Sequence, residues 1–403
     1  MMFDALTPNP PDPILALMER YRADSSPQKL DLGIGVYTDE HGVTPVFPSV
    51  LEGERRVLAK QTTKTYVGIA GDPQFCDLHQ SLTFGEDHPA RRDGRLRTIQ
   101  TPGGSGGLRV AAELLNRAAK PPTVWVSTPT WANHVPLLSS VGVQLKQYRY
   151  YDESTHALNL EGMLEDVGEA QAGDLILLHG CCHNPTGADL SEAQWTQVTD
   201  LILERHLVPF VDLAYQGFGR DVEGDVGGVR AMAARVPEML VVASCSKNFS
   251  LYRERTGSLS VLARKGSSAD VVASNMSAVA RSMYSMPPHH GAGIVAEVLS
   301  DPSLQRQWRG ELSAVCQRVA ELRSTLAQAL NAQVPDQDFT FLTQQQGMFS
   351  LLGVAREVID RLCAQHHIYI VGSGRMNLAG LPGQRVDDLA AAVAESICAT
   401  AAA

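Results

Sequence analysis

A lysine among small hydroxyl side chains is the first group in this sequence that could do covalent chemistry. Lys247 follows an apolar run that ends at Ser244, with Ser246 directly before it and Arg255 eight residues after it. The plainest interpretation of a lysine after a strand is a solvated loop charge. The other is an amine that forms a covalent bond with a carbonyl carbon.

An acidic residue at the end of another apolar run favours the second interpretation. Asp212 lies in the run VPFVDL, where an unpaired carboxylate would be costly to bury, and Tyr215 follows at a spacing that fits a turn. Without a cation nearby, Asp212 would be interpreted as a structural acid that caps the next turn. A buried acid and a lysine satisfy each other.

Two further segments supply polar groups of the right kind. HNPTG places Asn184 in a turn after an apolar run, and TPGGSGGLR opens a helix with a glycine-rich loop that contains Gly104 and Ser105. Backbone N–H groups at such a helix start form an anion site. Together these residues match the needs of pyridoxal phosphate: a lysine, an acid for the pyridine nitrogen, donors to the ring oxygen and a phosphate cup.

The elements that must position these groups alternate along the chain. Short β-branched runs alternate with amphipathic helical patterns, which predicts an α/β fold with a parallel sheet covered by helices. Function in such a sheet gathers at the carboxyl ends of the strands. The predicted strands span 124–127, 174–179, 208–213, 239–244 and 258–262, and the predicted helices between them span 108–119, 191–205 and 226–235.

The rest of the chain is mostly helical and then forms a second, smaller α/β unit. Helical patterns cover 271–283, 290–299 and 305–330, and the last is too long for one small helix. After Pro335 come strand-like runs at 347–352 and 368–371, a helix near 355–365 and a closing helix from Val386. We therefore predict a large domain over 45–312, with 1–44 and 313–403 forming the small domain.

Composition excludes several classes of protein. The 403 residues carry 34 basic and 44 acidic side chains, a net charge of −10, so we expect neither nucleic acid nor an anionic membrane as a partner. The start of the chain does not resemble a signal peptide, and the seven scattered cysteines are an odd number. Both features indicate a reducing cytoplasm.

Motifs along nearly the whole chain identify a family. In order, the sequence resembles the aspartate and aromatic-amino-acid subgroup of class I, fold-type I pyridoxal-phosphate aminotransferases. The motifs are LGIGVY, STPTWANH, HGCCHNPTGADL, DLAYQGFG, SCSKNFSLYRERTG, YSMPPHHGA, QQGMFS and SGRMNLAGL. The resemblance implies a large pyridoxal-phosphate-binding domain with a seven-stranded, mostly parallel sheet and a small α/β domain built from both termini.

The resemblance also implies roles at the cofactor. Lys247 would bond the cofactor aldehyde and later move the proton, Asp212 would pair with the ring nitrogen, and His134 would support Asp212. Tyr215 and Asn184 would hydrogen-bond the ring oxygen. Trp131 would stack on the ring, although a tryptophan at that place usually packs. The implied phosphate ligands are Gly104, Ser105, Ser244 and Arg255, joined by Tyr66 from a second copy of the chain.

The substrate residues follow from the same resemblance. Arg375 would clamp the substrate α-carboxylate with two parallel bonds, and Gly35 and Asn184 would lie beside it, with Trp131 over the substrate. Arg281 would cross from the second subunit to meet a distal carboxylate. Both crossings, by Tyr66 and Arg281, imply an obligate homodimer.

Three departures from the family pattern bear on specificity. Val67-Gly68-Ile69 stands where relatives often have Leu-Pro-Ile, Ala132 replaces an acidic residue, and Met286 replaces an asparagine of aspartate-selective relatives. A thioether near Arg281 favours apolar cargo. We predict transfer from aromatic, and also dicarboxylic, L-amino acids to 2-oxoglutarate by a ping-pong mechanism, with an aspartate-selective enzyme as the alternative.

Three remoter interpretations remain. The S-x-x-K pattern of Ser244–Lys247 occurs in acyl-serine hydrolases, but there it opens a helix. A non-catalytic effector-binding domain of the same fold would carry a DNA-binding module, for which the chain has no spare length. The histidines and cysteines of HGCCH, at 179–183, could suggest zinc, but ligands on a strand end that runs into a turn diverge, so we expect no metal.

Overall fold

The computed structural model describes residues 2–8 and 12–402, which form two compact units. The terminal unit comprises Met1–Val43, Glu321–Thr343 and Met348–Ala403, and the central unit comprises Thr44–Ala320 and Gln344–Gly347. The division after Val43 lies one residue from the sequence-based boundary. The division before Glu321 lies eight residues beyond the predicted 313, inside a helix, where no change of composition marks it.

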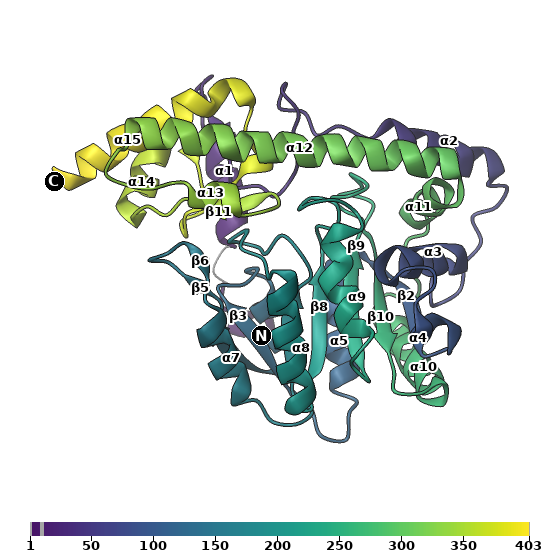
Figure 1. The fold of residues 1–403 in the computed structure, drawn as a ribbon. Coiled ribbons are helices and arrows are strands. Elements are labelled where there is room, and N and C mark those ends of the chain that lie inside the picture. Colours follow the sequence, from purple (N-terminus) through teal and green to yellow (C-terminus); the bar gives the residue numbers. More distant parts are fainter. Residues whose placement is uncertain (1, 9–11, 403) are drawn as a thin grey trace. The chain divides into compact units, whose positions relative to one another are not determined.

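The central unit is built on a seven-stranded, mostly parallel sheet, as predicted (Figure 1). Its order is β2-β10-β9-β8-β7-β3-β4, and only β10 runs antiparallel to its neighbours. The strands are β2 (Leu96–Pro102), β3 (Thr123–Thr128), β4 (Gln144–Arg149), β7 (Leu175–His179), β8 (Val208–Leu213), β9 (Met239–Ser244) and β10 (Thr256–Leu262). A two-stranded hairpin, β5 (Tyr151–Asp152) with β6 (Ala157–Leu158), follows β4.

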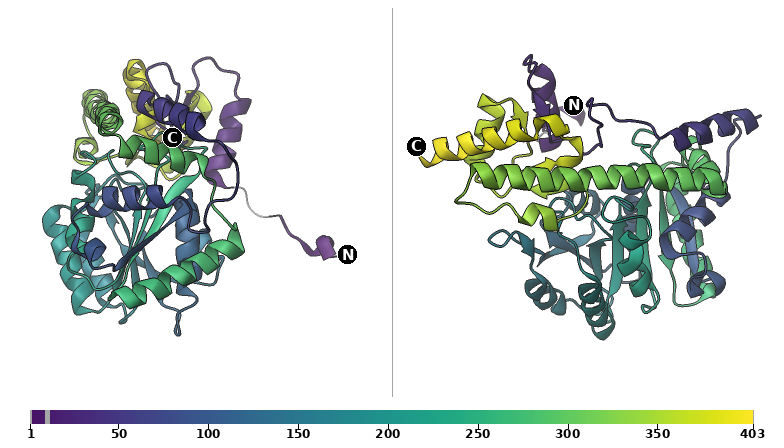
Figure 2. Two further views of the ribbon diagram at one scale, coloured as in Figure 1. Left: turned by 90° about the vertical axis from the view of Figure 1, so that its right-hand side faces the viewer. Right: turned by 45° about the horizontal axis from the view of Figure 1, so that its top comes forward.

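Helices cover both faces of this sheet, because its strands are apolar on both sides (Figure 2). Phe210 of β8 packs in one cluster with Leu108 of α5 (Gly103–Leu115), whereas a Cβ placed on Gly180 would meet both Val211 of β8 and Val229 of α9 (Gly227–Ala233). Neighbouring residues of β8 therefore face opposite helix layers, and Asp212 lies on the α5 side with Phe210. α8 (Glu192–Glu204) lies beside α9, in front of the sheet in Figure 1.

The remaining helices of the central unit surround this framework. They are α2 (Pro48–Lys60), α3 (Pro73–Phe84), α4 (Pro89–Arg92), α6 (His134–Ser139), α7 (Leu160–Gly168), η2 (Gly224–Val226), α10 (Gly266–Met283) and α11 (His290–Ser300). α12 (Pro302–Gln333) starts in the central unit and ends in the terminal unit. The stretch that the sequence marked as too long for one small helix forms a single long helix, α12, of 32 residues (Figure 2).

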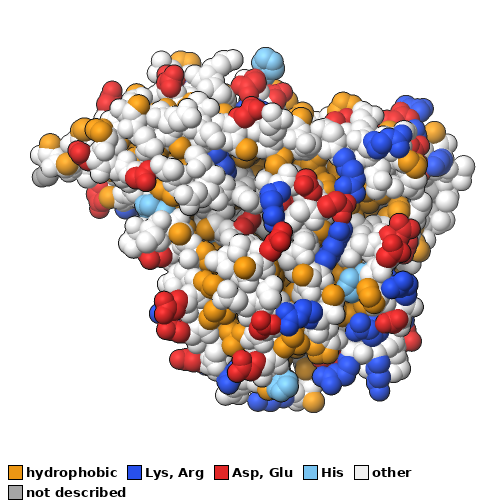
Figure 3. Space-filling view, viewed as in Figure 1, with side chains coloured by type: hydrophobic (Ala, Val, Ile, Leu, Met, Phe, Trp, Pro, Cys, Tyr) orange, Lys and Arg blue, Asp and Glu red, His pale blue; other side chains and the backbone are white. Residues whose placement is uncertain are grey.

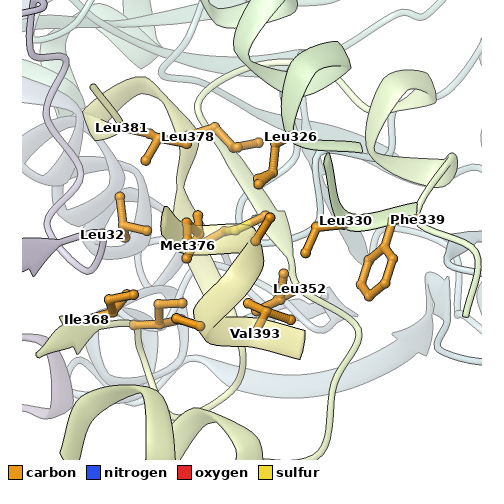
Figure 4. Close-up of a cluster of buried hydrophobic side chains, with 14 of the residues drawn as sticks. Leu32, Leu326, Leu330, Phe339, Leu352, Ile368, Met376, Leu378, Leu381 and Val393 are labelled. Carbon is orange, nitrogen blue, oxygen red and sulfur yellow. The ribbon is translucent and has the colours of Figure 1, made fainter. Parts of the chain in front are cut away.

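The terminal unit joins both ends of the chain in one core. β1 (Leu30–Asp31) pairs in parallel with β12 (Ile368–Tyr369), and β11 (Phe349–Leu351) pairs antiparallel with β13 (Arg375–Asn377). Leu32 packs in the same buried cluster as Leu326, Met376 and Val393 (Figure 4). The other elements are η1 (Met2–Ala5), α1 (Pro13–Ala23), α13 (Phe341–Gln344), α14 (Arg356–Gln365), η3 (Leu378–Gly380), η4 (Gly383–Arg385) and α15 (Val386–Ala401).

The surface agrees with the mixed charge of the sequence. On the face shown in Figure 3, basic and acidic side chains are interspersed. Among residues 2–8 and 12–402, the helices are all too short or too polar to span a bilayer.

Candidate functional site

The sheet itself brings the predicted cofactor residues together. β7, β8 and β9 are neighbours and run in parallel, with His179 opposite Asp212 and Asp212 opposite Val242. Their carboxyl ends therefore meet at one edge of the sheet. Tyr215 and Lys247 lie in the segments that directly follow β8 and β9, so both side chains start from this edge.

Lys247, Tyr215 and Asn184 form one side of the candidate site. The Lys247 Nζ lies 4.8 Å from the centroid of the Tyr215 ring, and Asn184 Nδ2 donates to the Tyr215 hydroxyl at 3.2 Å. Asn184 and Tyr215 are buried, whereas Lys247 is partly exposed. An amine, a phenol and an amide thus converge at the carboxyl edge of the sheet.

Asp212 forms the opposite side of the site. Its Oδ2 lies 2.9 Å from Nε2 of the fully buried His134. Burial alone would raise the pKa of Asp212, but the hydrogen bond from His134 and the charge of Lys247 hold it below its ordinary value. Asp212 is therefore an ionised carboxylate inside the protein, which fits a protonated pyridine nitrogen as its partner.

Trp131 contacts His134, the hydrogen-bond partner of that carboxylate. Its ring meets the His134 ring edge-on, at 5.2 Å between centroids and 90° between planes. Trp131 is half-buried and packs against the core that includes α5. Packing explains part of its position, so stacking of Trp131 on a cofactor stays a prediction.

An anion cradle lies beside the lysine, at the start of α5. No side chain caps this helix. The backbone N–H groups of its first turn, which contains Gly104 and Ser105, are therefore available to an anion. Gly103 has φ +71°, and a Cβ there would meet Arg255 Nη2 at 2.6 Å. A Cβ on Gly104 would meet Ser244 at 3.3 Å, so helix start, guanidinium and hydroxyl share one small space.

The cradle contains one residue that the sequence analysis did not assign. Ser246 accepts from Arg255 Nη1 at 3.5 Å, and Ser244 Oγ lies 3.2 Å from Ser246 Oγ. Its small hydroxyl, two residues from Ser244 and next to the lysine, was the only signal. Together the cradle, the lysine, the ionised acid and the phenol fit the phosphate, aldehyde, ring nitrogen and ring oxygen of pyridoxal phosphate.

Gly35 and Arg375 lie together in the terminal unit. Arg375 is buried, donates to the Gly33 carbonyl and lies over the Phe349 ring, with its Cζ 4.5 Å from the centroid. A Cβ on Gly35 would meet the same ring at 3.0 Å. The Phe349 ring thus packs against the Arg375 guanidinium, and its closeness to Gly35 leaves little room for a side chain at position 35.

Tyr66 and Arg281 belong to a separate, exposed region of the central unit. The Tyr66 side chain is 93% exposed, and Arg281 is exposed and donates to the Ser285 hydroxyl. The Val67 N–H donates to Met286 Sδ at 3.1 Å, which ties the Tyr66 loop to the segment after α10. A cavity of about 500 Å³ beside this loop is lined by Tyr66 and Met286.

The structure gives physical reasons against two remoter interpretations. Ser244 ends a strand instead of opening a helix, unlike the acyl-serine motif. His183 bonds the Ser127 and Thr186 hydroxyls through its two ring nitrogens. Cys181, Cys182 and Asp225 do offer ligand atoms within 4.8 Å of one another, but burial raises the pKa of Cys182 well above its ordinary value, and a neutral thiol binds metal weakly.

Comparisons with known proteins agree with this geometry. A family model described as "Aminotransferase class I and II" matches residues 27–393. An aspartate aminotransferase of Escherichia coli K12 is 43% identical over 97% of this chain and 99% of its own, and an aromatic-amino-acid aminotransferase of Paracoccus denitrificans is 43% identical over 98% and 99%. The structure of a Burkholderia pseudomallei aromatic-amino-acid aminotransferase, covalently bound to pyridoxal phosphate, is 39% identical with a TM-score of 0.96, over 98% of this chain and 99% of that one.

Proposed function

The chain belongs to the class I and II aminotransferases, and we propose from this that it transfers the amino group of aromatic and dicarboxylic L-amino acids to 2-oxoglutarate, with pyridoxal 5′-phosphate as cofactor. The observation that carries the proposal is the arrangement at the edge of the sheet. The Lys247 amine lies 4.8 Å from the centroid of the Tyr215 ring. It is accompanied by the buried, ionised Asp212 and by the start of α5, which has no side-chain cap.

The protein residues would divide the work between binding and proton transfer. When bound, pyridoxal phosphate supplies an aldehyde carbon that carries the amino group and a ring that withdraws electrons from the substrate Cα. Lys247 holds that carbon until the substrate amine replaces it, and its freed amine moves the α-proton. Asp212 keeps the ring nitrogen protonated, and Tyr215 and Asn184 hydrogen-bond the ring oxygen.

The overall reaction is a ping-pong exchange. The amino acid would leave as its oxo acid, with water supplying the new carbonyl oxygen, and 2-oxoglutarate would then accept the amino group in a second half-reaction. Gly104, Ser105, Ser244 and Arg255 hold the phosphate throughout, so the reacting carbon stays beside Lys247. Positioning of this kind accounts for a large part of enzymatic rate acceleration.

The proposal extends to substrate recognition, which includes a second copy of the chain. Arg375 binds the α-carboxylate, with Gly35, Asn184 and Trp131 beside the substrate. Arg281 meets a distal carboxylate from the second subunit, and Tyr66 reaches the phosphate from there. The exposure of Arg281 and Tyr66 in the single chain supports these crossings, since an exposed side chain is available to a second subunit.

A preference for aromatic donors rests on Met286. Its sulfur accepts from Val67 N–H, so a flexible thioether, and not an amide, stands near the Tyr66 loop. The relatives named above include both aspartate and aromatic enzymes at 43% identity, so an aspartate-selective enzyme is the second candidate. A donor screen with 2-oxoglutarate separates the two.

The screen compares kcat/KM for tyrosine, phenylalanine and aspartate. We expect the aromatic donors to be at least comparable to aspartate. A preference for aspartate of roughly a hundredfold or more, equal to about 2.7 kcal/mol, would favour the second candidate. Absence of transfer from any of these donors would overturn the aminotransferase itself.

The homodimer has its own test, the mixing of two defective chains. Arg281→Ala and Lys247→Ala homodimers should both fail with aspartate, but a mixed dimer has one site with native Lys247 and native Arg281. Random reassociation at equal amounts should restore about a quarter of the native sites. Mixed dimers that form but show no recovery with aspartate would place Arg281 in its own subunit's site.

We also propose that the enzyme works in the cytoplasm. All seven cysteines are free thiols, and six of them are buried. Such thiols persist in a reducing compartment.

A further inference from the structure

The loop that carries Tyr66 has little packing beneath it. It spans residues 61–72, between α2 and α3, and residues 62–66 are exposed. A cavity of about 500 Å³ is lined both by this loop and by Gly293 and Ala296 of α11. A segment with few buried apolar contacts is mobile unless specific bonds hold it. The position of Tyr66 therefore depends on a small number of hydrogen bonds.

Asp72, the last residue of this loop, bonds two elements at once. Its Oδ1 accepts from the Phe75 N–H at 3.0 Å and caps α3, and its Oδ2 lies 2.9 Å from Nε2 of His289. His289 directly precedes α11, which lies beside α3 (Figure 1). A carboxylate offers only acceptors, so the proton of this bond belongs to His289. The bond joins the end of the Tyr66 loop to the start of α11.

Gln100 of β2 strengthens the same junction from the interior. Its side chain is buried, its Oε1 accepts from the Asp72 N–H at 3.0 Å, and its Nε2 donates to the Pro288 carbonyl at 2.7 Å. Gly71 has φ +88°, and a Cβ there would meet the Gln100 Cβ at 2.3 Å, so the loop approaches the strand as closely as a glycine allows. One amide therefore bonds both segments that Asp72 and His289 join.

The same two segments meet again beside the exposed side chains. The Val67 N–H, next to Tyr66, donates to Met286 Sδ at 3.1 Å, and Arg281 donates to the hydroxyl of Ser285, next to Met286. A thioether sulfur is a weak acceptor, so this contact alone would let the loop pivot. The orientation of Tyr66 relative to Arg281 therefore depends on the stronger junction at the end of the loop.

We propose that Asp72, His289 and Gln100, here called the clasp, are positioning residues that hold the Tyr66 loop and the segment after α10 as one rigid element. The inference rests on the proposed function, in which Tyr66 and Arg281 of one subunit both reach the site of the second subunit. Because one site receives both side chains, their relative position must be kept. The clasp acts on cofactor and substrate only through Tyr66 and Arg281.

The first measurement is hydrogen exchange of the full-length protein, read by mass spectrometry. His289→Ala removes the donor, and Asp72→Asn keeps a cap for α3 but weakens the acceptor. In each variant we expect the amides of residues 62–71 to exchange at least about threefold faster, with those of β8 at the wild-type rate. His289→Gln retains a donor near the place of Nε2 and should stay within about twofold of the wild type.

The second measurement is function. Both single variants should weaken pyridoxal phosphate binding about threefold to tenfold and should lower the ratio of kcat/KM for aspartate to that for phenylalanine by a similar factor. A double variant, Asp72→Asn with His289→Ala, should be no worse than the worse single variant, because both break one bond. All proteins are compared in the same oligomeric state.

Asp77→Asn is the matched control. Asp77 is exposed on the same helix, α3, and pairs with Arg91 at 2.8 Å, away from the clasp. The same chemical change there should alter neither the exchange of the loop, nor the cofactor affinity, nor the donor ratio.

Three results would overturn the inference: wild-type exchange of the loop in both single variants, faster exchange with wild-type affinity and donor ratio, or equal losses in Asp77→Asn. A merely structural clasp would lower the free energy of unfolding and leave the donor ratio unchanged. If the wild-type protein binds no pyridoxal phosphate, the proposed function fails, whereas the exchange measurement still shows whether the clasp holds the loop.

Discussion

Two regions of the central unit, one around Asp212 and one around Tyr66 and Arg281, hold their polar side chains in opposite ways. Around Asp212 the polar groups are buried and each has a partner from the strands and turns of the same chain. At Tyr66 and Arg281 the side chains are exposed, and Arg281 donates to the neighbouring Ser285 hydroxyl. The difference supports the proposal that cofactor chemistry is prepared within one chain, whereas recognition of the distal group needs a second copy.

The physical cost differs accordingly. A buried carboxylate is tolerated only with hydrogen-bonding partners, so the Asp212 region must be ordered before any ligand arrives. An exposed arginine has no such cost and keeps its freedom until a partner surface covers it. Changes in the first region should therefore abolish chemistry for every substrate, and changes in the second should alter selectivity.

The largest effect should come from Lys247→Ala. Without the amine, both covalent attachment and proton transfer are lost, and we expect turnover to fall by at least about 10⁴-fold for aromatic and dicarboxylic donors alike. Steady-state assays with both donor classes measure this. Lys265→Ala, at an exposed position before α10, is the control and should keep full activity. Near-normal transfer in the Lys247 variant would refute the assignment.

Asp212→Asn should cost less, because the phosphate cradle and Lys247 remain. The neutral amide cannot hold a proton on the ring nitrogen, and we expect kcat to fall by roughly 10² to 10⁴ for all donors. Asp200→Asn, on the exposed side of α8, is the matched change and should be silent. A loss confined to one donor class would contradict the contrast between the two regions.

Arg281→Ala should break the pattern in the other direction. Loss of a charge-assisted bond to the distal carboxylate should lower kcat/KM for aspartate by about 10-fold to 100-fold, while phenylalanine changes by less than about threefold. Arg264→Ala, also exposed in the central unit, controls for loss of surface charge. Equal losses with both donors would mean that Arg281 supports the fold or the dimer and not the distal group.

The smallest effect concerns stability against acid. Burial lowers the pKa of His79 to about 4 and that of His179 to about 3. Both imidazoles therefore stay neutral in the folded protein at pH values near 6.5, where the same histidines take up protons in the unfolded chain. The free energy of unfolding should therefore fall as pH falls from about 6.5 towards 5, by up to about 1.4 kcal/mol per pH unit for each histidine. Urea titrations at several pH values measure the slope.

His79→Gln removes one of these protons and should flatten the slope by up to about 1.4 kcal/mol per pH unit. His41→Gln, on an exposed turn, should leave the slope unchanged. A slope that is the same in wild type and His79→Gln would show that His79 does not resist protonation in the fold.

Much of the framework is predictable from the sequence, for identifiable reasons. The predicted strands over 208–213 and 239–244 coincide with β8 and β9, because both are continuous apolar runs of a central strand. β4, QLKQYR, lies at the sheet edge and is largely exposed, so it carries no such run. α5 begins at Gly103, five residues before the predicted start. The prediction began too late because the first turn is rich in glycine, which has a low helix propensity.

The site divides in the same way. Lys247 and Asp212 attract attention by residue type and by their places after apolar runs. Thr130 does not, because a threonine beside a proline is ordinary, and its contacts with two histidines 4 and 49 positions away in sequence are visible only in the folded chain. Pairing of β3 with β7 creates that proximity, which composition and spacing alone do not encode.

The attachment of the cofactor to Lys247 tests the central claim most directly. The purified protein is loaded with pyridoxal phosphate, reduced with borohydride, digested and examined by mass spectrometry. We predict a single reduced cofactor adduct, on the peptide that contains Lys247. An adduct on another lysine, or none on a protein that still transfers amino groups, would contradict the account.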